Sequence, residues 1–488
     1  MPMYPSQQWF DRSIRIPYEL MEFVKRDTYS LLIKGSAGTG KTTLSLTILR
    51  ALNITDNFFY ICTRVSPKQL FLYYPWIAKF EQSQKELATE ASSSEPYYPS
   101  SFEDARLDEP ESLFERITNE LMDVKAPLIV IDSWDAVASF MDREARLNNE
   151  RVLQTWRERA GAKLIFINED STDTSLDFVV DGTVRLKQRL YENIRIREIL
   201  LLKLRGVKIN KPSYVFTLDK GVFQSCETYN SADFVNESNS TIPYITRIQK
   251  KKKKKILSPI SGRGRFKTGY RELDVNLGGG FPKKGIVVLE LDQNINVAVI
   301  MAFLSKIILN FITTDNRIFF YPVEGIDAIS AISHLKSYLS INPESRTPKI
   351  FWLGNEATGL PDFMVSCYNN KDSKKKLELF HNSVVKERQK APNRLFLSIM
   401  ITDELHKIDS EAKMKLFQFI RKNIDLSIFV VRDYKQTHLA PARCDAYLRF
   451  MIINGSLFLE SINPLSFLLA VVPNKSKVCP GIDLISMV

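Results

Sequence analysis

The eight residues from Gly35 to Thr42, GSAGTGKT, have the types and the spacing of a phosphate-binding loop. Its glycines allow the backbone to turn tightly and to point several N–H groups at an anion. Lys41 can reach the β- and γ-phosphates of a nucleotide, and the Thr42 hydroxyl can ligate Mg²⁺. We therefore expect ATP and Mg²⁺ to bind here. The residues expected to contact ATP are Gly35, Ser36, Ala37, Gly38, Thr39, Gly40, Lys41, Thr42 and Thr43.

A second acidic position supports this interpretation. The segment 127–134, PLIVIDSW, reads as an apolar strand that ends at Asp132. An acidic residue at the end of a strand beside a phosphate loop can hold Mg²⁺, as in a Walker B motif. The alternative is an ordinary strand that ends in a capping Asp. Because a complete phosphate loop precedes it, we favour Thr42 and Asp132 together as the metal ligands.

Short apolar segments alternate with helical patterns around these residues. The segment 29–34 reads as a buried strand before the loop, and Leu44, Ile48 and Leu49 have helical spacing after it. Further strands are expected at 57–63, 163–168, 178–186, 195–204 and 214–223. Helices are expected at 18–25, 68–80, 111–124 and 142–157, with an exposed loop at 84–112. This order predicts an α/β fold whose sheet is mainly parallel, with an antiparallel C-terminal extension.

The second half of the chain repeats the alternation without the loop chemistry. A strand at 285–291 is followed by Asp292–Val297, DQNINV, where the glycines and the lysine of a phosphate loop are missing. We therefore predict that this half does not bind ATP in the usual way. Asp403 and Glu404 follow a strand at 395–401, and without a facing phosphate loop we expect them to be structural. Other strands are expected at 317–323, 349–353 and 426–431, with a hairpin at 446–459.

Composition and charge set the remaining limits. The chain has 488 residues, a net charge of +11 and 44% apolar residues, which suits a protein of two or three globular domains. Lys250–Lys255 lies in a segment poor in apolar periodicity, which reads as a flexible linker. We expect an ATP-binding domain over 1–223, a Lys-rich linker over 224–265 and a second domain over 266–488. The lysines are either a solvated tether or a site for nucleic acid or an acidic partner.

Targeting signals and cysteines point to one compartment. The first residues lack a basic segment followed by an apolar core, so we expect no secretory signal. No apolar segment reaches the length of a transmembrane helix, so we expect no membrane partner. Five scattered cysteines suit a reducing cytosol, and we expect a cytoplasmic protein.

Several motifs together resemble a known family. They are the phosphate loop, IDS at 131–133, VDGTVRL at 180–186, KLRG at 203–206 and TGYRELDVNLGGGFPKKG at 268–285. The chain is similar to the KaiC/GvpD branch of RecA-like ATPases, with two KaiC-like domains in tandem of which the second is degenerate. The details at 16–35 and 63–70 most resemble archaeal GvpD-like regulatory proteins.

The resemblance implies further roles. Lys203 and Arg205 match the residues that, in this family, reach the γ-phosphate bound by a neighbouring subunit, which implies a homo-oligomer; the alternative is a charged exposed strand face. Family members usually carry a catalytic Glu after the second strand, where this chain has Arg64. A guanidinium cannot act as a base. The catalytic base is therefore unassigned, with Asp135 and Glu169 as possible substitutes and phosphate binding as another role for Arg64.

We accordingly expect a regulatory ATPase or ATP-binding switch with slow hydrolysis, acting in signalling or transcriptional control. In this role, Mg·ATP in the first domain controls oligomerisation or the binding of a regulatory protein partner. The alternative is an ATP-dependent DNA-binding protein of the recombinase kind that uses the lysine run, and it predicts DNA affinity that falls steeply with salt. The lysine run lies outside both expected domains and has no interleaved aromatic residues, which disfavours this alternative.

Overall fold

The computed structural model describes residues 15–54, 57–77, 102–123, 126–169, 174–234, 264–313, 316–322, 350–353, 364–366, 373–401, 410–432, 444–474 and 481–488. The chain forms two compact units, one of residues 1–226 with 487–488 and one of residues 227–486. Lys250–Lys255, Asp403 and Glu404 lie outside the described residues. None of the helices in the described ranges combines the length and the apolar character that a membrane crossing requires.

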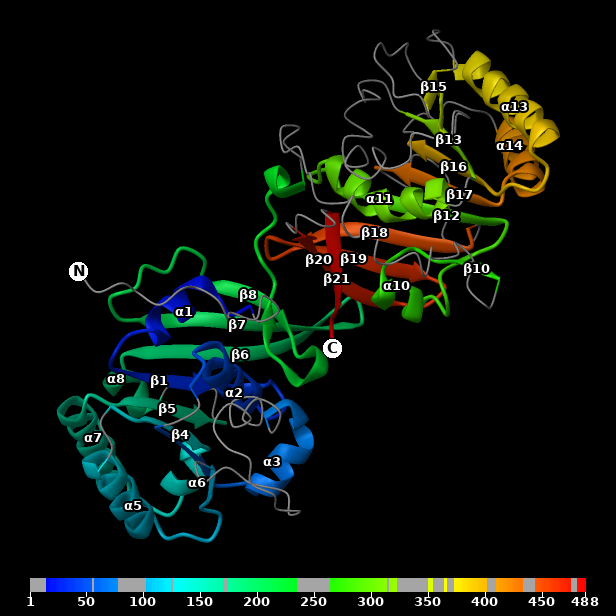
Figure 1. The fold of residues 1–488 in the computed structure, drawn as a ribbon. Helices are drawn as coiled ribbons and strands as arrows, with labels where there is room; N and C mark the ends of the chain where they lie inside the picture. Colours follow the sequence, from blue (N-terminus) through cyan, green and yellow to red (C-terminus); the bar gives the residue numbers. More distant parts are fainter. Residues whose placement is uncertain are drawn as a thin grey trace, which may run out of the picture. The chain divides into compact units, whose positions relative to one another are not determined.

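The first unit is built on one sheet of nine strands in the order β3-β2-β4-β5-β1-β6-β7-β8-β9 (Figure 1). The six strands from β3 to β6 are parallel, and β7, β8 and β9 continue the sheet antiparallel. The strands are β1 (Tyr29–Lys34), β2 (Phe58–Cys62), β3 (Phe102–Asp104), β4 (Leu128–Asp132), β5 (Lys163–Asn168), β6 (Gly182–Tyr191), β7 (Ile194–Leu204), β8 (Ser213–Thr217) and β9 (Gln224–Ser225). The predicted fold class is confirmed.

Helices cover both faces of this sheet, which is why its central strands are apolar on both sides. Side chains of α1, α2 and α3 pack on one face, and side chains of α5, α6, α7 and α8 pack on the other. The helical segments are α1 (Tyr18–Val24), α2 (Lys41–Ala51), α3 (Pro67–Tyr73), α5 (Pro110–Asp123), α6 (Trp134–Ala138), α7 (Arg143–Ala160), α8 (Ser175–Val179) and η1 (Asp219–Gly221).

The second unit repeats the topology. Its large sheet has the order β15-β14-β13-β16-β17-β12-β18-β19-β20-β21, parallel from β15 to β18 and antiparallel beyond. Strand β12 therefore holds the central place that β1 holds in the first unit. The strands are β10 (Arg265–Phe266), β11 (Phe281–Pro282), β12 (Gly285–Leu291), β13 (Arg317–Tyr321), β14 (Ile350–Trp352), β15 (Met364–Ser366), β16 (Phe396–Ile401), β17 (Leu426–Val431), β18 (Ala446–Ile453), β19 (Ser456–Asn463), β20 (Phe467–Asn474) and β21 (Gly481–Ser486).

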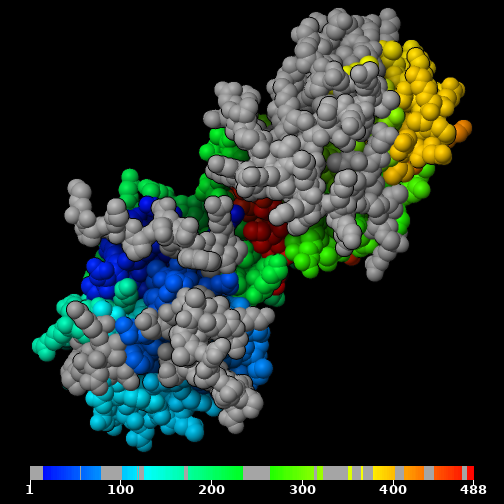
Figure 2. Space-filling model, viewed as in Figure 1, coloured from blue at the N-terminus to red at the C-terminus, as the bar shows by residue number. Residues whose placement is uncertain are grey.

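Its helices again lie on opposite faces of the large sheet. Side chains of α10 and α11 pack on one face, and side chains of α13 and α14 pack on the other. Figure 2 shows α13, in yellow, on the outside of this unit. The helical segments are η2 (Ser231–Phe234), α10 (Arg271–Asn276), α11 (Ala298–Thr313), α13 (Ser373–Lys390) and α14 (Ser410–Asn423).

Four expected elements differ from the structure. The strand expected at 214–223 ends at Thr217, and η1 follows it at Asp219–Gly221. The strand expected at 178–186 begins only at Gly182, because Thr174 and Asp177 form a capping box that starts α8. The helix expected at 68–80 is interrupted at Tyr74, which precedes a proline and adopts a non-helical conformation. Residues 75–77 are helical again, and 78–80 lie outside the description. The exposed loop expected at 84–112 contains β3 and the start of α5; its residues 84–101 lie outside the description.

The structure also differs at the edges of the expected linker. Residues 224–225 form β9, and residues 231–234 form η2, whose Phe234 is buried. Arg265 pairs with Pro282 as part of β10. The segment between these folded edges, 235–263, lies outside the described residues.

Candidate nucleotide-binding site

Glycines shape the loop between β1 and α2. All six residues of β1 are buried, and α2 starts at Lys41, directly after Gly40. Gly40 has a φ of 100°, and a Cβ atom there would lie 2.7 Å from Cδ1 of Leu218. At Gly35 a Cβ atom would collide with the carbonyl oxygen of Leu186 on β6. The two glycines therefore serve both the backbone conformation and the close packing of the loop against neighbouring strands.

Lys41 is held inside the curve of this loop. Its Nζ atom donates to the carbonyl oxygens of Gly35 at 2.8 Å and Ser36 at 3.0 Å, and the residue is only 6% exposed. Burial lowers the pKa of Lys41, while the negative charges of Glu169 and Asp132 act in the opposite direction. The ammonium group is thus fixed at the point where a phosphate loop needs its cation.

Thr42 and Asp132 are brought together across the sheet edge. The Thr42 hydroxyl donates to Oδ2 of Asp132 at 2.7 Å, and the Tyr60 hydroxyl donates to the same oxygen at 2.7 Å. Burial raises the pKa of Asp132, whereas the hydrogen bonds from Thr42 and Tyr60 act to lower it. A hydroxyl and a carboxylate are hard oxygen donors of the kind that Mg²⁺ takes, so the residues present fit this metal.

The remaining polar residues of the expected site serve the loop and its helix. The Thr39 hydroxyl donates to the carbonyl oxygen of Ser36 at 2.8 Å and so closes the loop on itself. Thr43 does not share the surroundings of Thr42: its Oγ1 atom lies 2.8 Å from the hydroxyl of Tyr74. Tyr60 and Tyr74 were missed by sequence reasoning, because an aromatic residue in an apolar segment gives no signal of a polar contact.

Arg64 links two carboxylates beside the loop. It follows the end of β2, and its guanidinium donates to Oδ2 of Asp135 at 2.6 Å and to Oε2 of Glu169 at 2.7 Å. Oδ1 of Asp135 accepts in addition from the backbone N–H of Glu169 at 3.1 Å. The two carboxylates considered as substitutes for the catalytic base therefore both pair with the arginine that stands in the place of the usual glutamate.

Comparison with known proteins agrees with this geometry. Residues 20–205 match the family model described as "GvpD gas vesicle protein, P-loop domain". This match begins in α1 and ends just after β7, so it contains the loop, Thr42, Asp132 and Arg64. The first unit is a GvpD-like P-loop domain.

Curated relatives share a larger part of the chain. Protein GvpD2 of Halobacterium salinarum is 26% identical over 323 residues, which cover 63% of this chain and 61% of that protein. Protein GvpD1 of the same organism is 28% identical over 303 residues, which cover 58% of this chain and 52% of that protein. A UPF0273 protein of Saccharolobus solfataricus is 24% identical over 226 residues, which cover 42% of this chain and 78% of that protein. The chain thus spans between half and two thirds of the length of the GvpD proteins it matches.

Lys203 and Arg205 lie away from the loop of their own GvpD-like domain. Arg205 donates its backbone N–H to Asp181, and Asp181 donates its own to Ser30, near the start of β1. The loop, in contrast, follows the end of β1. Lys203 donates to the carbonyl oxygen of Asp177 at 2.5 Å, and Arg205 lies 3.3 Å from Oδ1 of Asp181. The structure therefore does not bring these two cations to Lys41 of the same chain.

The equivalent loop of the second unit has the same length and a different interior. Six residues separate β12 from α11, as six separate β1 from α2, and Ala298 stands where the GvpD-like domain has Lys41. All six are described, and none of them has a positive φ.

Ile295 of this loop is buried in the core at 1% exposure, and Arg449 pairs with Asp292 at 3.0 Å. Arg432 donates to the carbonyl oxygens of this loop at 3.2 and 3.4 Å. The chain's own side chains thus occupy this loop.

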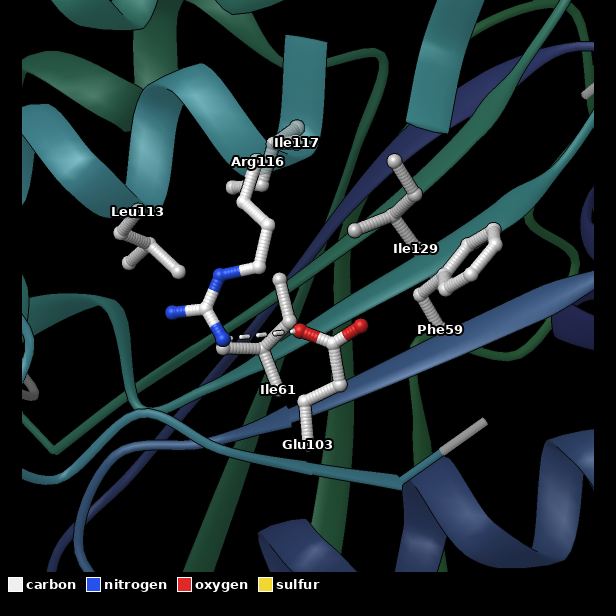
Figure 3. Close-up of a pocket in the computed structure, with 7 residues that line it drawn as sticks. All are labelled: Phe59, Ile61, Glu103, Leu113, Arg116, Ile117 and Ile129. Carbon is white, nitrogen blue, oxygen red and sulfur yellow. Dashed lines mark hydrogen bonds and ion pairs between the residues drawn. The ribbon is translucent and has the colours of Figure 1, made fainter. Parts of the chain in front are cut away.

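A small pocket lies elsewhere in the GvpD-like domain, between β2, β3, β4 and α5 (Figure 3). Arg116 reaches from α5 towards Glu103, with 3.3 Å between their charged atoms, and also pairs with Asp108. The other lining residues are apolar: Phe59, Ile61, Leu113, Ile117 and Ile129. None of the nine residues expected to bind ATP lines this pocket.

Proposed function

We propose that the first unit binds Mg·ATP and acts as a regulatory switch. The observation that carries this proposal is the contact of 2.7 Å between Thr42 and Asp132 at the mouth of a loop that already orients Lys41. A complete phosphate loop without such a facing carboxylate would be compatible with a vestigial motif. The residues from Gly35 to Thr43 would hold the phosphates, and Thr42 and Asp132 would hold the metal.

Each residue has a distinct task in this proposal. The loop backbone supplies N–H groups whose positions are fixed by the glycines, so little reorganisation accompanies binding. The Lys41 ammonium already contacts the loop carbonyls, and it would exchange these acceptors for phosphate oxygens. Bound Mg²⁺ would supply charge neutralisation between the β- and γ-phosphates. Tyr60 keeps the Asp132 carboxylate in one orientation by donating to the oxygen that also contacts Thr42.

We further propose that hydrolysis is slow. A carboxylate that pairs with a guanidinium must give up or share that ion pair before it can accept a proton from the attacking water. Asp135 uses both oxygens internally, one with Arg64 and one with the N–H of Glu169, and Glu169 also pairs with Arg64. An ATP-bound state that persists suits a switch, because a ligand shifts a conformational equilibrium only as long as it remains bound.

The relatives indicate the system in which the chain acts. The matching family is a P-loop domain of the gas vesicle protein GvpD, and two relatives are GvpD proteins. We propose that this chain acts in the same kind of system, as an ATP-dependent regulatory protein of the cytoplasm that controls a protein partner.

Assembly is part of the proposal. Arg205 lies level with the start of β1 and Lys203 with its middle, whereas the loop follows its end. A phosphate contact by these cations therefore requires the nucleotide of a second copy. Arg205 is 57% exposed and so is accessible to another chain. In this proposal ATP occupancy and the oligomeric state are linked.

The test is a titration with a fluorescent ATP analogue in the presence of Mg²⁺. Lys41→Ala removes a charged hydrogen-bond donor, and contacts of this kind are worth roughly 1.5–3 kcal/mol, so affinity should fall about 10- to 100-fold. Lys25→Ala, at an exposed lysine that follows α1, is the matched control and should bind as the wild type does. Equal affinity of Lys41→Ala and the wild type would reject the proposal. Size-exclusion chromatography with and without Mg·ATP tests the link to assembly, and an unchanged elution volume would contradict it.

A further inference from the structure

Arg197 on β7 is a buried cation, and none of the described residues supplies a counter-charge. It is 7% exposed, and its Nε and Nη1 atoms have no hydrogen-bond partner among those residues. In the part of the chain that the structure describes, no ion pair joins this guanidinium to a carboxylate. Its neighbour along the strand, Arg195, adds a like charge: burial and this charge both lower the pKa of Arg197. A site that desolvates and repels a cation is costly unless an anion compensates it.

The strand register places Arg197 beside the phosphate loop. Arg197 pairs with Gln188 on β6 and with Phe216 on β8. Gln188 lies two residues beyond Leu186, whose carbonyl oxygen meets Gly35. Two residues of a strand span about 7 Å. Because β6 runs parallel to β1, this step leads past the end of β1, towards the edge where the loop lies.

The neighbour on the other side leads to the same loop. Phe216 lies two residues before Leu218, and the side chain of Leu218 packs on Gly40. Arg197 is therefore bracketed by the strand segments that contact the first and the last glycine of the loop.

The side chain also points to the correct face of the sheet. Side chains alternate along a strand, so Arg197 shares its face with Ile199. Ile199 and Phe216 belong to the core that α2 covers, and α2 is the helix that the loop opens. The guanidinium is thus on the same face and at the same edge of the sheet as Lys41.

We propose that Arg197 is a second phosphate ligand of the nucleotide bound at this loop. The inference depends on the proposed function, because it needs a nucleotide in the loop. The inference extends the proposed function by assigning a phosphate contact to a strand residue that lies outside the phosphate-loop motif. The same segment carries the backbone packing of Gly35 through Leu186, so the ligand and the strand would be coupled directly.

The proposal predicts a combination of effects that a structural residue would not show. Replacing a buried cation that lacks a partner with a neutral side chain of similar length should stabilise the protein without nucleotide. The same change should weaken binding, since a charged hydrogen bond is lost. A residue that merely holds the fold together would show the reverse: lower stability and unchanged affinity.

The experiment uses the full chain carrying Arg197→Met, with Arg195→Met as the matched control. Both changes remove an arginine from the same strand and the same face, but Arg195 is exposed. We expect Arg197→Met to raise the melting temperature without nucleotide and to weaken a fluorescent ATP analogue about tenfold or more. Arg195→Met should change the affinity less than about threefold. Arg197→Lys retains the charge and should recover part of the affinity.

Inorganic pyrophosphate separates a phosphate contact from a contact to the nucleoside. Its competition constant against the fluorescent analogue should weaken in Arg197→Met by a factor similar to that for ATP. An unchanged pyrophosphate constant, or unchanged ATP affinity with a lowered melting temperature, would overturn the inference. If the wild type bound and Lys41→Ala did not, while Arg197→Met bound normally, this inference alone would fail. Absence of wild-type binding would reject the proposed function as well.

Discussion

The substitution Arg64→Gln tests whether an ion-pair bridge restrains hydrolysis. Arg64 donates at 2.6 Å to Asp135 and at 2.7 Å to Glu169. When the guanidinium is removed, Asp135 keeps its contact with the backbone N–H of Glu169, whereas the side chain of Glu169 loses its arginine partner. Glu169 is therefore the carboxylate that becomes available to accept a proton. Positioned general bases contribute about 10²- to 10⁴-fold, and an unoptimised one should reach the lower part of that range.

Arg64→Gln should lower the stability of the protein so little that unfolding does not interfere with the hydrolysis assay. Arg64 is 46% exposed, and its partners Asp135 and Glu169 are 23% and 34% exposed. Exposed ion pairs contribute about 0.2–1 kcal/mol each, so the two together should cost roughly 1 kcal/mol. Removing the Arg64 cation also leaves the carboxylates around Lys41 without its positive charge. Their negative charge then repels the phosphates of ATP more strongly. ATP affinity should fall a few-fold, and the assay must therefore use saturating Mg·ATP.

The assay is phosphate release in single-turnover and steady-state modes. Arg64→Gln should hydrolyse ATP roughly 100-fold faster than the wild type, and Arg64→Gln combined with Glu169→Gln should lose this gain. Arg106→Gln is the control, since Arg106 is 44% exposed and pairs with Asp104 at 2.8 Å near the same edge of the sheet. A rate at or below that of the wild type in Arg64→Gln would show that the bridge does not restrain hydrolysis.

Three further predictions concern the loop, its counterpart and a buried ion pair. Gly40→Ala forces a residue with a φ of 100° into contact with Leu218, so binding of the fluorescent ATP analogue should weaken at least tenfold; near-normal affinity would mean that the loop can relax. Ala298→Lys should not create a second nucleotide site, and a calorimetric stoichiometry above that of the wild type would contradict this. Asp177→Asn removes the charge of a carboxylate partner 2.7 Å from Lys34, whose side chain is fully buried. It should cost about 3 kcal/mol in urea unfolding, and a loss below about 1 kcal/mol would show that Lys34 is compensated elsewhere.

Local sequence signals predicted the loop and its flanking elements, because the conformations of these segments depend on residues that are close in the sequence. The strand before Gly35 and the helix after Gly40 lie where the spacing placed them. The second half was predicted equally well where strands are apolar runs, as at 426–431. The hairpin expected at 446–459 was found, but β20 and β21 beyond it were not expected, because their short apolar segments carry no flanking motif.

Contacts between distant segments were beyond sequence reasoning. Arg64 was recognised as unusual, but its pairing with Asp135 and Glu169 depends on how three strand ends meet. Arg197 lies within the strand expected at 195–204, and only the structure shows its burial and its register with Gln188 and Phe216. Pairing between strands is set by the whole sheet, so one residue's type cannot reveal it.

The filled loop after β12 makes the difference between the two halves hard to reverse. A single restored lysine at Ala298 would meet a backbone without positive φ angles, and Ile295 would still belong to the core. Removing Asp292 would leave Arg449 without its 3.0 Å partner. Each step back towards a phosphate cradle is therefore disfavoured by itself, and only concerted changes would succeed. Single mutations would therefore leave the second half without a nucleotide site. Its surface residues would then be free to diverge without any constraint from nucleotide binding.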